Sequence, residues 1–204
     1  MAGFPKLKIC GVRDGAFARR AEELGVDYLG FIFAEKSPRY VTPDEAAAIA
    51  LTLSGKAKKV GVFTDAPLSE MLDTARRVPL DVVQLHSRDY GADEILALRA
   101  AGWEVWQLES FGADAMLLDG AAADGRSGGT GLRADWKRAA ELAASGVRVV
   151  LAGGLSSENI LAAAETGCAV LDVNSSLEES PGVKSLALLD ELFRSIRGRA
   201  PSPI

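Results

Sequence analysis

The chain has 204 residues, of which 48% are hydrophobic and 25% charged, with a formal net charge of −5. This composition is typical of a globular protein and excludes intrinsic disorder. The basic residues are scattered rather than gathered in an arm that could bind nucleic acid. Two cysteines are too few for a disulfide scaffold. The first residues lack the long apolar run that is typical of a signal peptide, and no apolar run approaches the roughly 20 residues of a membrane span. We therefore expect a reduced, cytoplasmic protein with neither a nucleic-acid nor a membrane partner.

Short apolar and β-branched runs recur along the chain and predict eight strands. These runs cover residues 7–11, 28–33, 58–64, 82–86, 104–109, 115–119, 148–153 and 169–175. Alanine- and leucine-rich segments with helical spacing lie between them. They predict seven helices, at residues 14–24, 43–53, 67–77, 91–101, 134–144, 156–165 and 184–197.

The alternation of strands and helices predicts an α/β fold with parallel strands and right-handed crossovers. Eight such units favour a single closed (β/α)8 TIM barrel over residues 1–204, with residues 197–204 as a flexible tail. An open doubly wound sheet fits less well, because no glycine fingerprint follows the first strand. Only residues 110–114 separate the fifth strand from the sixth. Either the fifth helix is missing there or the fifth strand is misplaced.

Cys10 ends the first predicted strand, just before Gly11. Because side chains alternate along a strand, Lys8 and Cys10 share one face of it. A free cysteine is often a small buried hydrophobe. The chemistry of TIM barrels, however, takes place at the carboxyl ends of the strands. Cys10 is therefore a candidate both for core packing and for reactivity.

Other predicted strand ends carry polar residues and glycines, which we expect at the same end of the barrel. They include Arg39, Gln84, His86, Asp119, Gly153, Gly154, Asp172, Asn174, Ser175 and Ser176, and the Gly-Gly-Thr-Gly segment at 128–131. The glycine and serine clusters after the sixth, seventh and eighth strands predict a phosphate site. Glycine lets backbone N–H groups approach an anion, and these loops hold phosphate in many barrels. Ordinary tight turns are the alternative interpretation.

Cys10 and Asp119 face the predicted barrel mouth from opposite sides. A thiolate and a carboxylic acid on either side of a sugar could take one proton and give another, although aspartate is also a common turn residue. Arg39 suits a two-pronged contact with a carboxylate, unless it is a solvated loop residue. His86 either orients a substrate or is structural. Cys168 opens the eighth strand at the other end, so we expect it in the core.

Closure of the barrel places the eighth strand beside the first, with Lys8 and Asp172 pointing inward below the mouth. Either charge alone in the interior would be costly, so we expect a buried ion pair. The Lys8 ammonium group would then lie near Cys10 and favour its thiolate.

Segments along nearly the whole chain resemble the phosphoribosylanthranilate isomerase family of tryptophan biosynthesis. They are KICG at 8–11, GFIFAEKSPRYV at 30–41, VGVFTD at 60–65, VQLH at 83–86, LLD at 117–119, GGTG at 128–131 with Asp135 and Trp136, LAGGLSSENI at 151–160 and PGVK at 181–184. They occur in the family's order. The family fold is a (β/α)8 barrel with a reduced or missing fifth helix, which would explain the short connection at 110–114.

The resemblance implies an Amadori rearrangement, in which N-(5-phospho-β-D-ribosyl)anthranilate becomes 1-(2-carboxyphenylamino)-1-deoxy-D-ribulose 5-phosphate. Asp119 matches the family's general acid, Cys10 its general base, and Arg39 the residue that holds the anthranilate carboxylate. The matching phosphate loops contain Gly129, Gly131, Gly154 and Ser175. No metal or organic cofactor is implied, because the substrate nitrogen supplies the electron sink.

One segment departs from the commoner family pattern, in which Ser-Ser-Gly follows Asp172-Val173. Here the sequence is Asn174-Ser175-Ser176, which changes the backbone N–H groups available to the phosphate.

The alternative functions are another phosphosugar barrel, such as an indole-glycerol-phosphate synthase or a pentose-phosphate epimerase, or a non-catalytic phosphosugar-binding barrel. The synthase needs a catalytic lysine at a strand end, and the epimerase needs several histidines. A barrel that only binds a phosphosugar does not need an acid–base pair. The sequence is compatible with a monomer or a homodimer.

Overall fold

Eight parallel strands form a closed barrel in sequence order in the computed structural model, which describes residues 4–87, 89–120 and 134–198. The strands are β1 (Lys6–Ile9), β2 (Tyr28–Ile32), β3 (Lys58–Phe63), β4 (Val82–Leu85), β5 (Glu104–Leu108), β6 (Ala115–Leu118), β7 (Val149–Leu151) and β8 (Val170–Val173). β8 closes the barrel by pairing with β1. Each strand overlaps its predicted segment, and the prediction runs one or two residues past each strand end.

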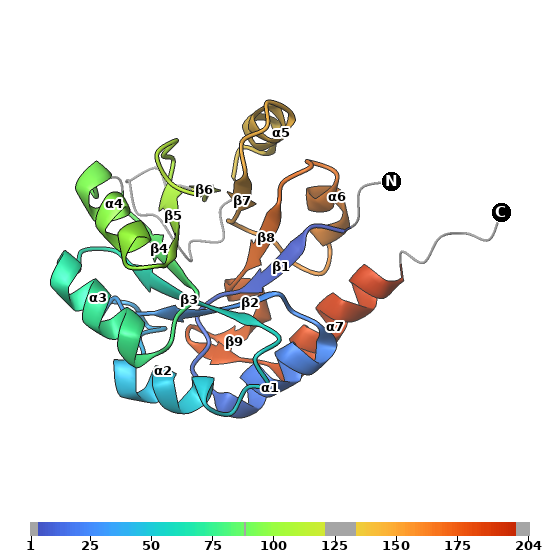
Figure 1. Ribbon diagram of the computed structural model, residues 1–204. Coiled ribbons are helices and arrows are strands. Elements are labelled where there is room, and N and C mark those ends of the chain that lie inside the picture. The colour runs from blue at the N-terminus through green and yellow to red at the C-terminus, as the bar shows by residue number, and fades with distance from the viewer. Residues whose placement is uncertain (1–3, 88, 121–133, 199–204) are drawn as a thin grey trace.

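The helices pack outside the strands (Figure 1). Those in the described residues are α1 (Gly15–Leu24), α2 (Pro43–Ala50), α3 (Leu68–Arg77), α4 (Ala92–Ala100), α5 (Trp136–Ala144), α6 (Ile160–Ala164) and α7 (Leu186–Arg197). α6 is shorter than predicted because the Asn159 side chain accepts a hydrogen bond from Ser156 N and donates one to Gly154 O, which holds this segment in a turn. No helix in the described ranges is long and apolar enough to cross a membrane.

The chain passes from β5 to β6 through residues 109–114, all of which are described and none of which is helical. Asp114 holds this connection against the barrel: its Oδ2 accepts a hydrogen bond from Val105 N at 2.8 Å, and its Oδ1 lies 2.6 Å from Arg99 Nη2 of α4. The fifth strand is therefore where the sequence predicts it, and the helix between these two strands is absent.

Apolar side chains form two cores because both faces of a parallel barrel strand are covered. The barrel interior holds Tyr28, Val60, Val82, Trp106 and Val170 among others. The second core lies between the strands and the helices and includes Cys168. Packing of Cys168 in the core is thus confirmed.

A small hairpin after β8 was not predicted. It follows a short 3-10 helix, η1 (Ser175–Leu177), and consists of β9 (Glu178–Ser180) and β10 (Val183–Lys184). Its turn contains Gly182 at φ 85°, where a Cβ atom would lie 2.3 Å from Pro38 O. Only glycine allows this approach, which packs the hairpin against the loop after β2.

Candidate active site

A cavity of about 550 Å³ opens where the barrel strands end. It brings together most of the site residues predicted from the sequence: Cys10, Arg39, His86, Asp119, Gly153, Gly154 and Ser175. Gly153 and Gly154 have φ angles of 92° and 65°, a left-handed backbone that suits glycine. This turn after β7 therefore presents main chain to the cavity.

The remaining predicted residues are placed differently. Ser176 does not belong to the described cavity lining, because its hydroxyl donates a hydrogen bond to Leu155 O at 2.6 Å and so serves the loop after β7. Gly129 and Gly131 lie outside the described residues.

Cys10 follows β1 and is 5% exposed. Gly30 of β2 makes room for it: a Cβ atom at this position would lie 2.9 Å from Cys10 Sγ and 3.2 Å from Lys8 Cε. Burial raises the pKa of the Cys10 thiol, and the positive charge of Lys8 lowers it only in part. The predicted influence of Lys8 has the right sign, but burial outweighs it, so Cys10 rests as a thiol at neutral pH.

Lys8 and Asp172 form the predicted buried ion pair. Lys8 Nζ donates to Asp172 Oδ2 at 2.5 Å, and the side chains are 0% and 6% exposed. β1 and β8 pair in a register that sets these residues opposite each other. Burial alone would lower the pKa of Lys8, but the attraction of Asp172 and its hydrogen bond raise it overall. Burial also raises the pKa of Asp172, and the charge and hydrogen bond of Lys8 oppose that shift.

Asp119 follows β6 and faces His86, which follows β4. Asp119 Oδ2 lies 3.2 Å from His86 Nε2, with the two side chains 7% and 11% exposed. Nε2 makes no hydrogen bond within the described residues, so the two side chains are close neighbours without a hydrogen bond between them. Gln84 Nε2 lies 3.2 Å from His86 Nδ1, which fits a neutral ring with its proton on Nε2. His86 thus lies beside the candidate acid.

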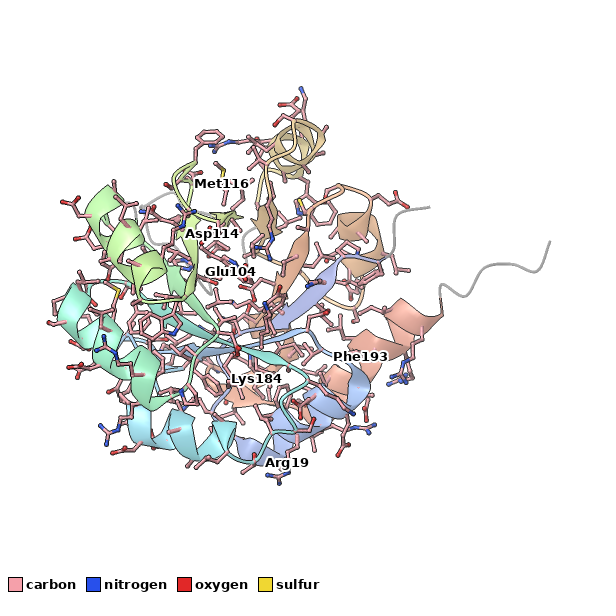
Figure 2. The ribbon with its side chains drawn as sticks, viewed as in Figure 1. Arg19, Glu104, Asp114, Met116, Lys184 and Phe193 are labelled. Carbon is pink, nitrogen blue, oxygen red and sulfur yellow. The ribbon has the colours of Figure 1, made fainter. Side chains whose placement is uncertain are left out.

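Arg39 is held by Glu178, which is in turn held by Lys184; the sequence analysis assigned neither residue to the site. Arg39 Nε and Nη2 donate to the two Glu178 carboxylate oxygens at 2.8 Å each. Lys184 Nζ donates to Glu178 Oε1 at 3.0 Å and to Asn174 Oδ1 at 2.9 Å. Figure 2 labels Lys184 in the middle of the view, away from residues of the outer surface such as Arg19.

This buried cluster of Arg39, Glu178 and Lys184 carries one positive charge in excess. Burial alone would raise the pKa of Glu178, but hydrogen bonds from Arg39 and Lys184 hold it below its usual value. Burial lowers the pKa of Lys184, and Glu178 opposes that shift. Arg39 therefore keeps a fixed orientation, and Nη1 is the guanidinium nitrogen that makes no hydrogen bond within the described ranges.

The described cavity thus combines a thiol, a carboxyl group beside an imidazole, the Arg39 guanidinium group of the cationic cluster and a glycine turn. A thiol and a carboxyl group in one cavity can move protons to and from a single substrate. The cationic cluster can bind a carboxylate, and the glycine turn can approach a phosphate.

Comparison with known proteins gives a consistent result. The family model for N-(5'phosphoribosyl)anthranilate (PRA) isomerase matches residues 7–195. An N-(5'-phosphoribosyl)anthranilate isomerase of Allorhizobium ampelinum is 36% identical over 219 aligned positions, covering 98% of this chain and 97% of the relative. The enzyme of the same name from a Geobacter species is 41% identical, with 88% of this chain and 91% of the relative covered.

Solved structures agree. A phosphoribosyl anthranilate isomerase from Thermus thermophilus superposes with a TM-score of 0.86 at 34% identity, covering 96% of this chain and all (100%) of that one. An isomerase in complex with reduced 1-(o-carboxyphenylamino)-1-deoxyribulose 5-phosphate has a TM-score of 0.78 at 26% identity, and covers 95% and 99% of the two chains. A Thermotoga maritima isomerase described as dimeric has a TM-score of 0.77 at 26% identity, with 95% and 99% coverage. The chain belongs to the N-(5'-phosphoribosyl)anthranilate isomerase family.

Proposed function

We propose that this protein converts N-(5-phospho-β-D-ribosyl)anthranilate to 1-(2-carboxyphenylamino)-1-deoxy-D-ribulose 5-phosphate by an Amadori rearrangement, the isomerase step of tryptophan biosynthesis. The observation that carries the proposal is that Cys10 and Asp119 line one cavity together with Arg39, the member of the cationic cluster that reaches it. A barrel that only binds a phosphosugar has no use for this acid–base pair.

In the proposed mechanism, Asp119 protonates the furanose ring oxygen. The bond between C1 and that oxygen breaks, and the nitrogen lone pair forms a C1=N bond. Cys10, as a thiolate, then removes the proton from C2. The electrons of the C2–H bond form a C1=C2 bond while the C=N electrons return to nitrogen, giving an enolamine. Gain of a proton at C1 and loss of the hydroxyl proton at C2 complete the ketone.

Ring opening also helps to activate Cys10. Burial raises the pKa of the thiol in the free protein, whereas the opened intermediate carries a positive charge on its C1=N nitrogen. A cation close to a thiol lowers the pKa of that thiol. Cys10 would therefore release its proton to solvent after ring opening and act as a thiolate when it removes the C2 proton.

Substrate binding would use the other groups of the cavity. The cluster of Arg39, Glu178 and Lys184 would hold the anthranilate carboxylate, because its excess positive charge is balanced by one anion. Gly153, Gly154 and Ser175 would hold the phosphate together with Gly129 and Gly131, and His86 would orient the sugar beside Asp119. No metal or organic cofactor takes part in these steps.

We further propose that residues 1–204 form one (β/α)8 domain without a helix between β5 and β6, and that it acts in the cytoplasm as a monomer or a homodimer. The closed strand order supports one domain, and the dimeric Thermotoga maritima relative supports a homodimer.

The test is isomerase turnover, followed by the loss of substrate fluorescence, for wild type, Cys10→Ser and Asp119→Asn. Each substitution removes one proton-transfer group, so we expect each to lower kcat by about 100-fold or more. Cys168→Ala is the matched control, because that cysteine packs outside the barrel wall. Near-normal rates in both site variants would contradict the roles of Cys10 and Asp119. Growth of an isomerase-deficient host without tryptophan tests the substrate independently.

A further inference from the structure

The proposed mechanism leaves one buried carboxylate oxygen of the cavity without a role. Asp172 Oδ2 accepts from Lys8 at 2.5 Å, whereas Asp172 Oδ1 is buried with no hydrogen-bond partner in the described part of the chain. Asp172 lines the cavity with Cys10 and Asp119. A buried polar atom that lacks a partner costs free energy. This oxygen is therefore placed to accept a hydrogen bond from a ligand.

We propose that Asp172 Oδ1 accepts a hydrogen bond from the C2 hydroxyl group of the substrate, and that this contact holds C2 against Cys10. The inference rests on the proposed function, in which Cys10 removes the C2 proton. The hydrogen and the hydroxyl group are bonded to the same carbon. An interaction that places the C2 hydrogen at Cys10 must therefore also fix the C2 hydroxyl group nearby.

The barrel supplies this juxtaposition. β1 and β8 are neighbours, with Lys8 opposite Asp172, and Cys10 follows two residues later on the same face as Lys8. The thiol and the carboxylate thus come from adjacent strand ends and line the same cavity. Asp119 comes from β6, away from both strands, and is assigned to the ring oxygen. Asp172 is therefore the carboxylate beside Cys10 that remains for the C2 hydroxyl group.

Lys8 makes Asp172 a stronger acceptor. Its ammonium group donates to Oδ2 at 2.5 Å and lowers the pKa of the Asp172 carboxyl group against the effect of burial, which favours the ionised form. A hydrogen bond to an ionised acceptor is stronger than one to a neutral group. The same contact polarises the hydroxyl group on C2 when the enolamine becomes a ketone, because that step removes the hydroxyl proton. Lys8 is thus a positioning residue and Asp172 a substrate-binding residue.

The first experiment needs no variant. Calorimetry compares two ligands of wild type: reduced 1-(o-carboxyphenylamino)-1-deoxyribulose 5-phosphate, which has a hydroxyl group at C2, and its counterpart with a methylene group there. A hydrogen bond to a charged acceptor predicts about 10-fold or more tighter binding of the hydroxyl ligand. Equal binding of the two ligands by wild type would overturn the inference.

The second experiment uses Lys8→Met/Asp172→Leu, which removes both charges so that neither is left buried alone. The preference for the hydroxyl ligand should fall to about twofold or less, with the affinity for the methylene ligand retained. Lys8→Met/Asp172→Asn keeps an amide oxygen at position 172 and should show an intermediate preference. Circular dichroism checks that both variants fold.

An undiminished preference in a folded Lys8→Met/Asp172→Leu protein would show that another residue reads the hydroxyl group, and would overturn the inference. A wild-type protein that binds neither ligand and has no turnover would instead contradict the proposed function. The two failures are therefore distinguishable.

Discussion

At the scale of single residues, the surroundings of Cys10 shift the pKa of its thiol in opposite directions. The thiol is buried at the cavity wall, and burial raises its pKa. Lys8 lies below it as a compensating charge, and Gly30 keeps the space in which both side chains fit. At neutral pH the thiol therefore ionises only when the positive charge of the opened substrate lowers its pKa.

This predicts a specific pH dependence of kcat/KM. A base acts only when deprotonated, and the pKa of Cys10 in the free protein lies above the ordinary thiol value of about 8.5. We therefore expect kcat/KM to rise with pH and to keep rising through that value. Alkylation of Cys10 by iodoacetamide in the Cys168→Ala background should follow the same rise. A plateau of kcat/KM beginning below pH 8 would contradict this reading.

At the scale of elements, Glu22 ties α1 to the segment that enters β3. Its carboxylate accepts hydrogen bonds from the backbone N–H groups of Ser54, Lys56 and Ala57 at 2.6, 2.9 and 3.1 Å. Burial alone would raise the pKa of Glu22, but these three donors lower it overall. One side chain thus replaces the backbone partners that an irregular segment lacks.

Glu22→Gln should lower the free energy of unfolding at pH 7 by about 1–3 kcal/mol, because an amide has only one acceptor oxygen for these donors. The lowered pKa means that Glu22 stabilises the fold above the unfolded value of about 4.3, and that this stabilisation is lost as pH falls through the folded value. Urea unfolding at pH 7 and pH 3 measures the difference, which should shrink at pH 3. The neighbouring Glu23→Gln is the control, since Glu23 is 67% exposed; an equal loss in both variants would contradict the role of Glu22.

At the scale of the whole molecule, the two ends of the barrel have different tasks. The Trp106 ring lies in the interior, 5.0 Å from Tyr28 between ring centroids, and its Nε1 donates to Glu104 Oε1 at 2.6 Å. Arg148 pairs with the same carboxylate; Figure 2 labels Glu104 at the start of β5. This cluster closes the amino-terminal end of the barrel, while the described cavity lining comes from the other end.

Trp106→Ala should therefore affect stability far more than chemistry. Truncation of a fully buried tryptophan costs about 3–5 kcal/mol, which urea unfolding at pH 7 measures. The folded fraction at 25 °C should keep kcat within about threefold of wild type. The opposite pattern is expected of Asp119→Asn. A 100-fold loss of kcat in folded Trp106→Ala protein would show that the two ends are coupled.

The features of the fold and of the site that could be predicted from the sequence are those that follow from repeating patterns. Alternation along strands, together with closure of the barrel, is enough to predict Lys8 opposite Asp172 and Cys10 at the mouth. Glu178 gave no such signal, because its partner Arg39 is 139 positions away and the hairpin that carries it has no periodic pattern. PGVK at 181–184 matched the family but did not reveal that Lys184 holds Glu178. The limits of α6 depend on hydrogen bonds of the Asn159 side chain, which no periodicity records.

The ion pair of Lys8 and Asp172 joins positions 164 residues apart, and this separation has a kinetic consequence. A chain that has not yet added its last strand cannot shelter the Lys8 charge, so the pair must form at a late stage of assembly. Contacts between such distant positions also slow folding, because a long loop must close first. On refolding, isomerase activity would therefore return only after β1 and β8 have paired. The rate at which activity recovers would then report the rate of barrel closure.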